Sequence, residues 1–530
     1  MGMMTTMMGM MMTAGDGNDK TLSGVMSGAG NYIKAGGGTQ TLTGDNSYTG
    51  STTISAGLLK VLRDDPTSYL AATSGFTGPG NLTIESSAGS FTADIVTGTH
   101  VQLAGTALGN LIIGKAGNTR QIDLSSNITT TGTQTYNGPV RLVGGDRTVT
   151  TTNSNVVFAS TVNSDGTQRA LTVANGTGDT TFTGAIGGSA PVKALTITSD
   201  QLTAGAITLN GALTATLANA STISGVIANG GGGTASLVKA GSGTLTLSGA
   251  STYTGTTAIN AGDLTVSGSL HDSTAVSIAS GADYNVNASD TVASIEGAGN
   301  IVLASGQTLT AGDGNDKTLS GVMSGAGNYI KAGGGTQTLS ASNTYTGTTQ
   351  VSAGTLTVSG SGRLSDDTAV TVDNGATYNV AVSDTVASIA GAGSITLGSN
   401  TLTSGGSNAS TTFSGVLSGT NGNIVKAGSG TLTLSGANTY TGTTAINAGD
   451  LTVSGSLHDS TAVSIASGAD YNVNASDTVA SIEGDGNIVL ASSQTLTAGD
   501  GNDKTLSGVM SGAGSYVKAG AGTQTLSASN

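Results

Sequence analysis

A segment of 31 residues is repeated along the chain, and this repetition constrains the fold more than any single residue does. The segment runs from Val238 to Gly268 with the sequence VKAGSGTLTLSGASTYTGTTAINAGDLTVSG. It returns at 425–455 with one change, Ser251 to Asn438. Looser copies lie at 33–61, at 330–360 and from Val517 onward. We therefore expect a stack of similar structural units.

Each segment has the pattern of short β-strands separated by turns. Leu245 and Leu247 alternate with threonine and serine, and this period of two places one face of a strand inward. The pattern resumes around Ile259 and again at Leu264 and Val266, after breaks at glycine. We expect three such strands with glycine corners to make one coil of about 18–24 residues.

One such coil is too small to bury its apolar face alone, so it has to stack on similar coils above and below. The expected fold is all-β, a parallel β-solenoid whose imperfect coils form an elongated rod. With 4.7–4.9 Å between hydrogen-bonded strands, the rod would be on the order of 100–140 Å long. Length is the property that this sequence encodes most clearly.

A longer period is superimposed on the segments, and its offset from Val238 to Val425 is 187 positions. Residues 238–343 and 425–530 differ at six of 106 positions, and all six changes are small, polar or volume-conserving. The KAG lysines divide this period into half-periods of 92 and 95 positions, and they lie at Lys239, Lys331, Lys426 and Lys518.

These periods suggest how the chain is divided. The predicted parts are a methionine-rich segment 1–12, a solenoid repeat 13–61, a divergent solenoid segment 62–236, super-repeat 237–423 and super-repeat 424–530. Residues 1–12 lack a basic region and an A-x-A cleavage site, so we interpret them as a truncation artefact or an atypical export segment. An inserted subdomain at about residues 62–130 is the alternative to continuous coils there.

The composition excludes several classes of protein. With 86 Gly, no Trp and only 3% aromatic residues, the chain has little material for a globular core with deep pockets. A net charge of −14 and the lack of a Lys/Arg cluster in the sequence argue against nucleic acid or an anionic membrane as a partner. Without cysteine there is no disulfide scaffold or thiolate metal site.

The order (V/I)KAGxGTxTLSGxxxYTGTTxxxAGxLTVSG resembles the autotransporter-associated β-strand repeat of passenger domains in type V secreted bacterial proteins. Residues 62–236, with ITTTGTQTYNGPVRL among them, resemble the repeats of filamentous haemagglutinin-like adhesins. The resemblance implies a right-handed β-helix on the surface of a Gram-negative bacterium, exported by an outer-membrane translocator. Since a signal peptide and a translocator barrel belong to such proteins, we expect a fragment of a longer array, or a subunit completed by another molecule.

A glycine- and aspartate-rich motif offers the one candidate for metal binding. AGDGNDKTL begins at Ala14, Ala311 and Ala498 and resembles the calcium nonapeptide GGxGxDxUx. One extra residue separates Asp19 from Leu22, and the copies are far apart, whereas calcium takes six to eight oxygen ligands from successive stacked loops. A polar turn is the favoured interpretation and calcium the alternative; no other cofactor is expected.

Recurrent tyrosines and histidines have structural interpretations. The tyrosines of the YTG turn would suit stacking on sugar rings, but their fixed place in the repeat favours packing at a coil corner. They are Tyr48, Tyr253, Tyr345 and Tyr440. His271 and His458 occupy one repeat position and His100 stands apart, so no catalytic histidine is predicted.

Two acidic pairs and the threonine pattern complete the candidates. Asp64 with Asp65 and Asp366 with Asp367 come nearest to paired catalytic carboxylates. Only Arg63, Arg363 and Tyr69 accompany them, so solvated loop acids are favoured. Pairs such as Thr244 and Thr246 would suit an ice-binding or carbohydrate-binding ladder, but alternation on a strand already requires outward polar residues.

The leading prediction is a non-enzymatic, secreted structural protein, a stalk or fibre used in adhesion or in a biofilm matrix. The lead-in TAGDGNDKTLSGVMSGAG lies near both ends of the chain, so similar open strand edges and head-to-tail self-association are expected. The alternatives are a polysaccharide-acting β-helix enzyme with its site in residues 62–130, and a solenoid that binds ice or glycans. The receptor, a glycan or a protein, is not identified by the sequence.

Overall fold

The computed structural model describes residues 5–7, 9–67, 75–103 and 108–529. Every regular element in these residues is a β-strand, the strand pairs are parallel, and none of the elements is a helix that would span a membrane. The chain forms two compact units, Met1–Thr274 and Ala275–Asn530. The predicted fold class, an all-β parallel solenoid, is confirmed.

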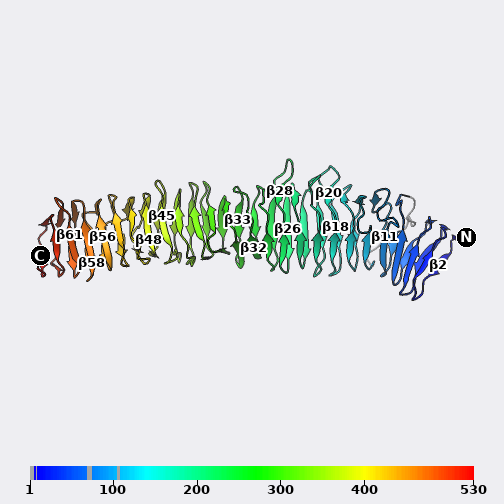
Figure 1. Ribbon diagram of the computed structural model, residues 1–530, viewed down its shortest axis with the longest axis horizontal. Coiled ribbons are helices and arrows are strands. Elements are labelled where there is room, and N and C mark those ends of the chain that lie inside the picture. The colour runs from blue at the N-terminus through cyan, green and yellow to red at the C-terminus, as the bar shows by residue number, and fades with distance from the viewer. Residues whose placement is uncertain (1–4, 8, 68–74, 104–107, 530) are drawn as a thin grey trace. The chain divides into compact units, whose positions relative to one another are not determined.

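Within each unit, strands from successive coils lie side by side and form ladders, each named here by its first strand (Figure 1). The β3 ladder of unit 1 consists of β3 (Lys20–Leu22), β6 (Thr39–Leu42), β9 (Leu58–Leu62), β11 (Asn81–Glu85), β13 (Leu111–Ile113), β16 (Gln134–Tyr136), β19 (Val156–Phe158), β22 (Thr180–Phe182), β24 (Leu202–Ala204), β27 (Ser221–Ile223), β30 (Leu245–Leu247) and β32 (Gly262–Val266). The β15 ladder consists of β15 (Ile128–Thr129), β18 (Arg147–Thr150), β21 (Leu171–Ala174), β23 (Leu195–Ser199), β26 (Ala212–Leu217), β29 (Ser236–Ala240) and β31 (Thr257–Ile259). Shorter ladders are formed by β1 (Thr5–Met7), β4 (Met26–Gly28) and β7 (Ser47–Tyr48); by β2 (Met11–Ala14), β5 (Asn31–Lys34), β8 (Thr52–Ile54) and β10 (Phe76–Thr77); by β12 (Ile95–Val96), β14 (Ile122–Leu124), β17 (Val140–Leu142) and β20 (Val162–Ser164); and by β25 (Ile207–Leu209) and β28 (Ile227–Asn229).

Unit 2 is built in the same way. The β35 ladder consists of β35 (Asp290–Val292), β38 (Thr308–Ala311), β41 (Asn328–Lys331), β43 (Thr349–Val351), β45 (Ala369–Val372), β48 (Ser388–Gly391), β51 (Thr411–Phe413), β54 (Thr431–Leu434), β56 (Gly449–Val453), β58 (Ala469–Val473), β61 (Asn487–Leu490) and β64 (Met510–Gly512). The β33 ladder consists of β33 (Ala275–Ile278), β36 (Ser294–Gly297), β39 (Lys317–Leu319), β42 (Thr336–Leu339), β44 (Thr355–Val358), β46 (Thr377–Val380), β49 (Ser394–Thr396) and β52 (Val416–Ser418). The β47 ladder consists of β47 (Asp384–Val386), β50 (Thr401–Ser404), β53 (Asn423–Lys426), β55 (Thr443–Ile446), β57 (Ala462–Ile465), β60 (Ser481–Gly484), β63 (Lys504–Leu506) and β66 (Gln524–Leu526). Two short ladders are β34 (Ala282–Val286), β37 (Asn300–Leu303) and β40 (Met323–Gly325), and β59 (Asp477–Val479), β62 (Thr495–Ala498) and β65 (Ser515–Lys518).

The repeat segment does not correspond to one coil with three strands. Leu264 of β32 pairs with Leu245 of β30, so the third strand of the segment already belongs to the next coil. One coil of this type consists of β29, β30 and a turn that holds the buried Tyr253. The expected assignment of three strands to one coil is therefore wrong for the repeat segment, because a tyrosine turn replaces one strand.

Coil length varies more than the sequence pattern suggested. A short coil joins Asp283 to its partner Asn300, whereas a much longer one joins Leu82 to its partner Leu111. The long coil is accommodated because β11 pairs with β9 on one side and with β13 on the other. The β3 ladder therefore continues through residues 62–130, the segment for which an inserted subdomain was the alternative.

The core is a narrow stack of inward-facing side chains. In β26, Leu213, Ala215 and Leu217 are fully buried and alternate with half-buried residues, as the period of two predicts. Aromatic rings also stack from coil to coil: Phe158 lies 5.0 Å from Tyr136 and 4.8 Å from Phe182, measured between ring centroids. Offset stacking of this kind adds to the apolar burial.

Equivalent residues of successive half-repeats lie on different ladders of unit 2. Lys331 ends β41 on the β35 ladder, Lys426 ends β53 on the β47 ladder, and Lys518 ends β65 on the β59 ladder. From β41, four coils along the β35 ladder lead to β51, and β53 follows two strands later. Each half-repeat therefore spans about four and two-thirds coils.

Candidate functional site

The tyrosines of the YTG turn point into the coil corners. Tyr48, Tyr253, Tyr345 and Tyr440 are at most 2% exposed. The Tyr253 hydroxyl lies 2.5 Å from Thr257 Oγ1, and that of Tyr440 lies 2.6 Å from Thr444 Oγ1. Burial prevents these rings from stacking on a sugar, so the prediction of corner packing is confirmed.

The lysines of the KAG motif are buried and join consecutive coils. Lys239 is fully buried, and its Nζ donates to the carbonyl oxygens of Ala240, Gly241 and Ala261 at 3.0, 2.8 and 2.9 Å. Ala261 lies in the next coil, since Lys239 pairs with Ile259. Lys34, Lys331 and Lys426 make the same three contacts. We call this arrangement the lysine clamp.

The backbone of the KAG motif is shaped to hold the ammonium. Gly241 has a φ of 75°, and a Cβ there would lie 2.3 Å from the carbonyl oxygen of Leu217, so only glycine fits. Burial lowers the pKa of Lys239 to about 8, while three carbonyl acceptors favour its charged form. The clamp is a fixed structural cation, and sequence reasoning treated the lysine only as a repeat marker.

Buried tyrosines also form hydrogen bonds with buried aspartates on strands of unit 2. The Tyr284 hydroxyl donates to Asp290 at 2.8 Å, and Tyr471 donates to Asp477 at 3.3 Å. Tyr378 donates to Asp384, which also accepts from the backbone N–H of Leu364 in the preceding coil. Burial raises the pKa of Asp384 to about 6 and that of Asp477 to about 6. The sequence analysis did not single out these pairs.

The carboxylates of the AGDGNDKTL motif are occupied by backbone donors. Asp313 Oδ1 accepts from Asn315 N at 2.7 Å within the turn, and Asp316 Oδ1 accepts from Thr336 N at 2.7 Å in the next coil. Asp16, Asp19, Asp500 and Asp503 make corresponding contacts. Across the described part of the chain, no three His, Cys, Asp or Glu side chains are grouped so as to hold a metal. These contacts favour the polar turn over the calcium site.

Asp64 lies in a surface pocket of about 290 Å³ together with Arg63 and Asp65. The Asp64 carboxylate accepts from the hydroxyl of Ser86 at 2.6 Å and from Ser87 N at 2.9 Å, and these contacts lower its pKa. A carboxyl group with a lowered pKa is a poor proton donor near neutral pH. Tyr69, the aromatic residue expected beside the pair, lies outside the described residues.

Asp366 and Asp367 line a second pocket, of about 420 Å³, beside Arg363. Both aspartates are exposed, in agreement with the expectation of solvated loop acids. Asn343 also lines this pocket and is only 4% exposed. Its Oδ1 accepts a hydrogen bond of 2.8 Å from Met323 N in the preceding coil. Its Nδ2 donates to the carbonyl oxygen of Arg363 at 2.7 Å.

The three histidines stabilise turns. The Nδ1 of His458 accepts from Ser460 N at 3.1 Å, and that of His271 accepts from Ser273 N at 3.1 Å. His100 Nδ1 accepts from Val96 N at 3.1 Å. In each case the contact is local and occupies one ring nitrogen of the histidine.

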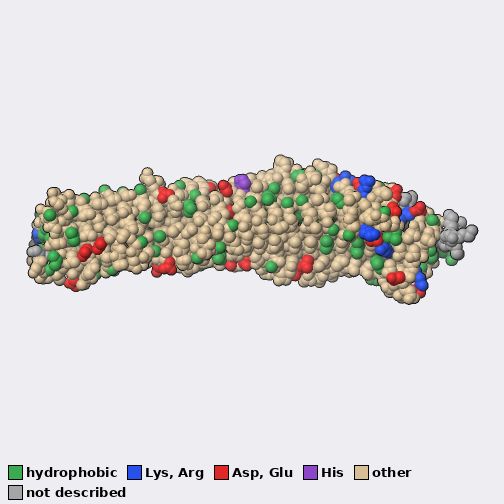
Figure 2. Space-filling model, viewed as in Figure 1, with side chains coloured by type: hydrophobic (Ala, Val, Ile, Leu, Met, Phe, Trp, Pro, Cys, Tyr) green, Lys and Arg blue, Asp and Glu red, His purple; other side chains and the backbone are tan. Residues whose placement is uncertain are grey.

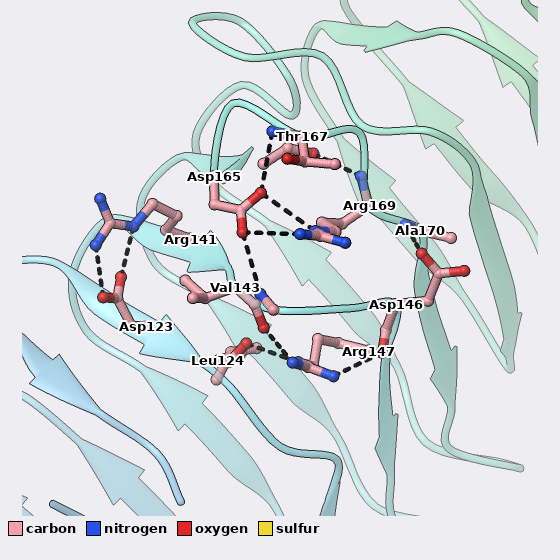
Figure 3. Close-up of polar contacts among 12 residues, drawn as sticks. Asp123, Leu124, Arg141, Val143, Asp146, Arg147, Asp165, Thr167, Arg169 and Ala170 are labelled. Carbon is pink, nitrogen blue, oxygen red and sulfur yellow. Dashed lines mark hydrogen bonds and ion pairs between the residues drawn. The ribbon is translucent and has the colours of Figure 1, made fainter. Parts of the chain in front are cut away.

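Folding brings together arginines that are separate in the sequence. Arg141 binds Asp123 through two hydrogen bonds of 2.8 and 2.6 Å (Figure 3). Asp165 accepts from Gly144 N and from Arg169, and these contacts lower its pKa to about 2. Arg147 donates to the carbonyl oxygens of Leu124, Val143 and Asp146.

The interpretation that Lys and Arg form no cluster is thus corrected for the folded chain. On the face drawn in Figure 2, blue and red side chains gather together over part of unit 1. Because Asp123, Asp146 and Asp165 lie among the arginines, the cluster alternates in sign and holds loops of consecutive coils together.

Outward threonines are aligned from coil to coil in unit 1. Along the β3 ladder, five threonines occupy consecutive register positions, namely Thr181, Thr203, Thr222, Thr246 and Thr265. The β15 ladder has a row of Thr172, Thr196 and Thr214 beside a row of Ala174, Thr198 and Thr216. The coil-to-coil alignment that a ligand-binding threonine face requires is present at these two places.

Comparison with known proteins identifies the repeats. The family model of the passenger-associated-transport-repeat matches residues 33–61, 237–266, 330–358, 424–453 and 517–530. An adhesin, the BmaC autotransporter of Brucella suis biovar 1 (strain 1330), is 33% identical to this chain over 546 residues, which include 94% of the chain. The chain therefore carries the repeat of the autotransporter passenger family and is similar to an autotransporter adhesin.

The aligned part is only 15% of that adhesin, so the chain spans a small fraction of its relative. No solved structure matches it. The first four matched blocks each contain one lysine clamp and one buried tyrosine turn. The family repeat is therefore one part of the solenoid at which one coil is tied to the next.

Proposed function

We propose that this chain is a non-enzymatic, adhesive part of a cell-surface protein of a Gram-negative bacterium, delivered by an outer-membrane translocator. The observation that carries the proposal is the similarity to an autotransporter adhesin along nearly the whole chain. The structure adds support because the buried lysines and aspartates are used in contacts between coils, and the buried tyrosines in contacts at coil corners.

The test is attachment. Beads coated with the purified chain should be retained on epithelial monolayers or on matrix-protein or glycan coatings more strongly than albumin-coated beads. No retention on any of these surfaces would contradict the adhesive role. Release of new reducing ends from a panel of polysaccharides would instead support the enzyme alternative.

Self-association is part of the same proposal. An open strand edge pairs with other strands, so chains are expected to associate head to tail. Sedimentation should then show a mass that rises with concentration. A single monomeric species at high concentration would remove this part of the proposal and leave adhesion untouched.

The threonine rows of unit 1 favour a second candidate function, binding to a regular surface such as ice or a crystalline polysaccharide. Thr222 and Thr246 lie within five consecutive in-register threonines, and strands in such a ladder are about 4.8 Å apart. The wild-type chain should inhibit ice recrystallisation or sediment with cellulose or chitin. A Thr222→Lys, Thr246→Lys variant should lose that activity if the rows are responsible.

A further inference from the structure

One surface pocket of unit 2 combines charged groups that form no ion pair with any described residue. The pocket, of about 420 Å³, lies between two consecutive coils, with Ser342 and Thr344 on one side and Arg363, Ser365, Asp366 and Asp367 on the other. Its volume is in the range of small-molecule sites. Among the described residues, no acidic side chain forms an ion pair with Arg363, whose guanidinium donates to the carbonyl oxygen of Gly362 at 2.9 Å.

The two carboxylates of this pocket also have no hydrogen-bond donor among the described residues. Asp366 and Asp367 are exposed, and their side chains accept no hydrogen bond from a described residue. The pocket at Arg63 provides the comparison, because there Arg63 pairs with Asp45 and Asp64 accepts from Ser86 and Ser87. The same residue types are thus internally satisfied at one corner and available to a ligand at the other.

The unpaired corner also differs from its two sister corners in the chain. Seven residues separate Val266 from Thr274, and seven separate Val453 from Thr461, but nine separate Val358 from Thr368. Arg363 forms the bridge with the preceding coil that Ser269 and Ser456 form elsewhere. Asp367 immediately precedes Thr368, where Ser273 and Ser460 precede the corresponding threonines. Relative to these two sister corners, the longer loop therefore adds an arginine and a carboxylate.

The chemistry of the free groups selects the class of ligand. A guanidinium donates through a planar fork, and carboxylates only accept, so together they suit a molecule with neighbouring donors and acceptors. Vicinal hydroxyls of a sugar ring provide both. A strongly anionic ligand would be repelled, because the two aspartates outweigh the charge of the one arginine.

We propose that this pocket is a saccharide-binding site for a neutral or amino-bearing sugar. The proposal deepens the adhesive function given above and rests on it for its biological role. Arg363 donates to ring hydroxyls, Asp366 and Asp367 accept from hydroxyl or ammonium groups, and the exposed hydroxyl of Thr344 completes the rim.

The experiment uses the whole chain and five free sugars, namely glucose, galactose, N-acetylglucosamine, glucosamine and N-acetylneuraminic acid. Saturation-transfer NMR should detect at least one of the first four, and the anionic sugar should bind less well. Arg363→Ser and Asp367→Ser install the residues of the sister corners, so both variants should fold. Each should weaken binding about tenfold or more, because each removes a hydrogen bond to a charged group.

A His458→Ser variant at a sister corner is the matched control and should bind like the wild type. The proposal is overturned if no sugar binds, if binding survives both substitutions, or if the anionic sugar binds best. The bead assay separates the two claims. Attachment without sugar binding keeps the adhesive function and rejects the pocket, whereas sugar binding without attachment keeps the pocket and rejects the function.

Discussion

The Nζ atom of Lys426 donates a hydrogen bond of 2.9 Å to the carbonyl oxygen of Ala448, which lies in the next coil. The same ammonium binds the carbonyl oxygens of Ala427 and Gly428 in its own coil, at 2.7 and 2.8 Å. All three donors of the ammonium are used, so a buried charge is compensated by backbone acceptors. The lysine thus ties two coils together without an acidic partner.

Replacement of Lys426 by methionine should destabilise the solenoid. The change leaves three carbonyl groups without their donor, at an expected cost of about 2–4 kcal/mol. Lys518 is the internal control, because it is exposed and its Nζ donates only to Gly520 among the described residues. Urea unfolding should therefore show a clear loss for Lys426→Met and little change for Lys518→Met. Equal effects would refute the clamp.

One difference between the super-repeats should affect stability. Asn438 accepts from Leu417 N and donates to the carbonyl oxygens of Gly436 and Ser456, whereas the buried Ser251 hydroxyl has no partner among the described residues. We expect Ser251→Asn to stabilise the chain by about 1 kcal/mol and Asn438→Ser to destabilise it by about 1–2 kcal/mol. Thermal unfolding of both variants tests this, and the same sign for both would contradict it.

The buried tyrosines should respond differently to loss of the hydroxyl. The Tyr345 hydroxyl is bonded to Thr349 Oγ1, so Tyr345→Phe should cost about 1 kcal/mol. The Tyr329 hydroxyl is buried and contacts no polar partner in the described part of the chain, so Tyr329→Phe should be neutral or stabilising. Denaturant midpoints of the two variants provide the measurement. A larger loss for Tyr329→Phe would show that its hydroxyl has a partner.

Stability should decrease as the pH rises from about 4 to 6. Burial raises the pKa of Asp384 and of Asp477 to about 6, above the ordinary value of 3.8, so the folded chain binds more protons in this window. Each group contributes stability below the ordinary pKa and loses it, up to roughly 3 kcal/mol, as the pH passes the folded value. Urea midpoints at pH 4.5 and 7 measure the change.

The double variant Asp384→Asn, Asp477→Asn isolates these two groups. Its midpoints at the two pH values should differ less than those of the wild type. Asp165 has the opposite behaviour, since its pKa is lowered to about 2 and its contribution is lost only in stronger acid. A wild-type chain that gains stability from pH 4.5 to 7 would show that other carboxylates dominate.

Repetition made the fold predictable, and the same repetition concealed parts of the site. The alternation around Leu245 and Leu247 correctly placed the inner face, and the fixed phase of Tyr253 correctly placed it at a corner. The assignment of Leu264 to the same coil was wrong because strand pairing depends on where the tyrosine turn closes, and the sequence pattern does not show this.

The lysine clamp was missed because a charged side chain normally lies outside. A signal existed, since Ile424 and Lys426 are two residues apart on one strand and therefore share its inner face. The ion pairs around Arg141 and Asp165 had no such signal, because their partners are brought together only by stacking of coils of unequal length.

Because each half-repeat spans about four and two-thirds coils, equivalent residues of successive half-repeats lie on different sides of unit 2. Lys331, Lys426 and Lys518 mark three different sides, so any loop tied to the same repeat phase also turns by a third of a revolution from one copy to the next. A neighbouring surface therefore meets a copy of the motif whichever side it approaches. A longer array would therefore present equivalent loops on all of its sides. A repeat of a whole number of coils would instead place all of these loops on one side.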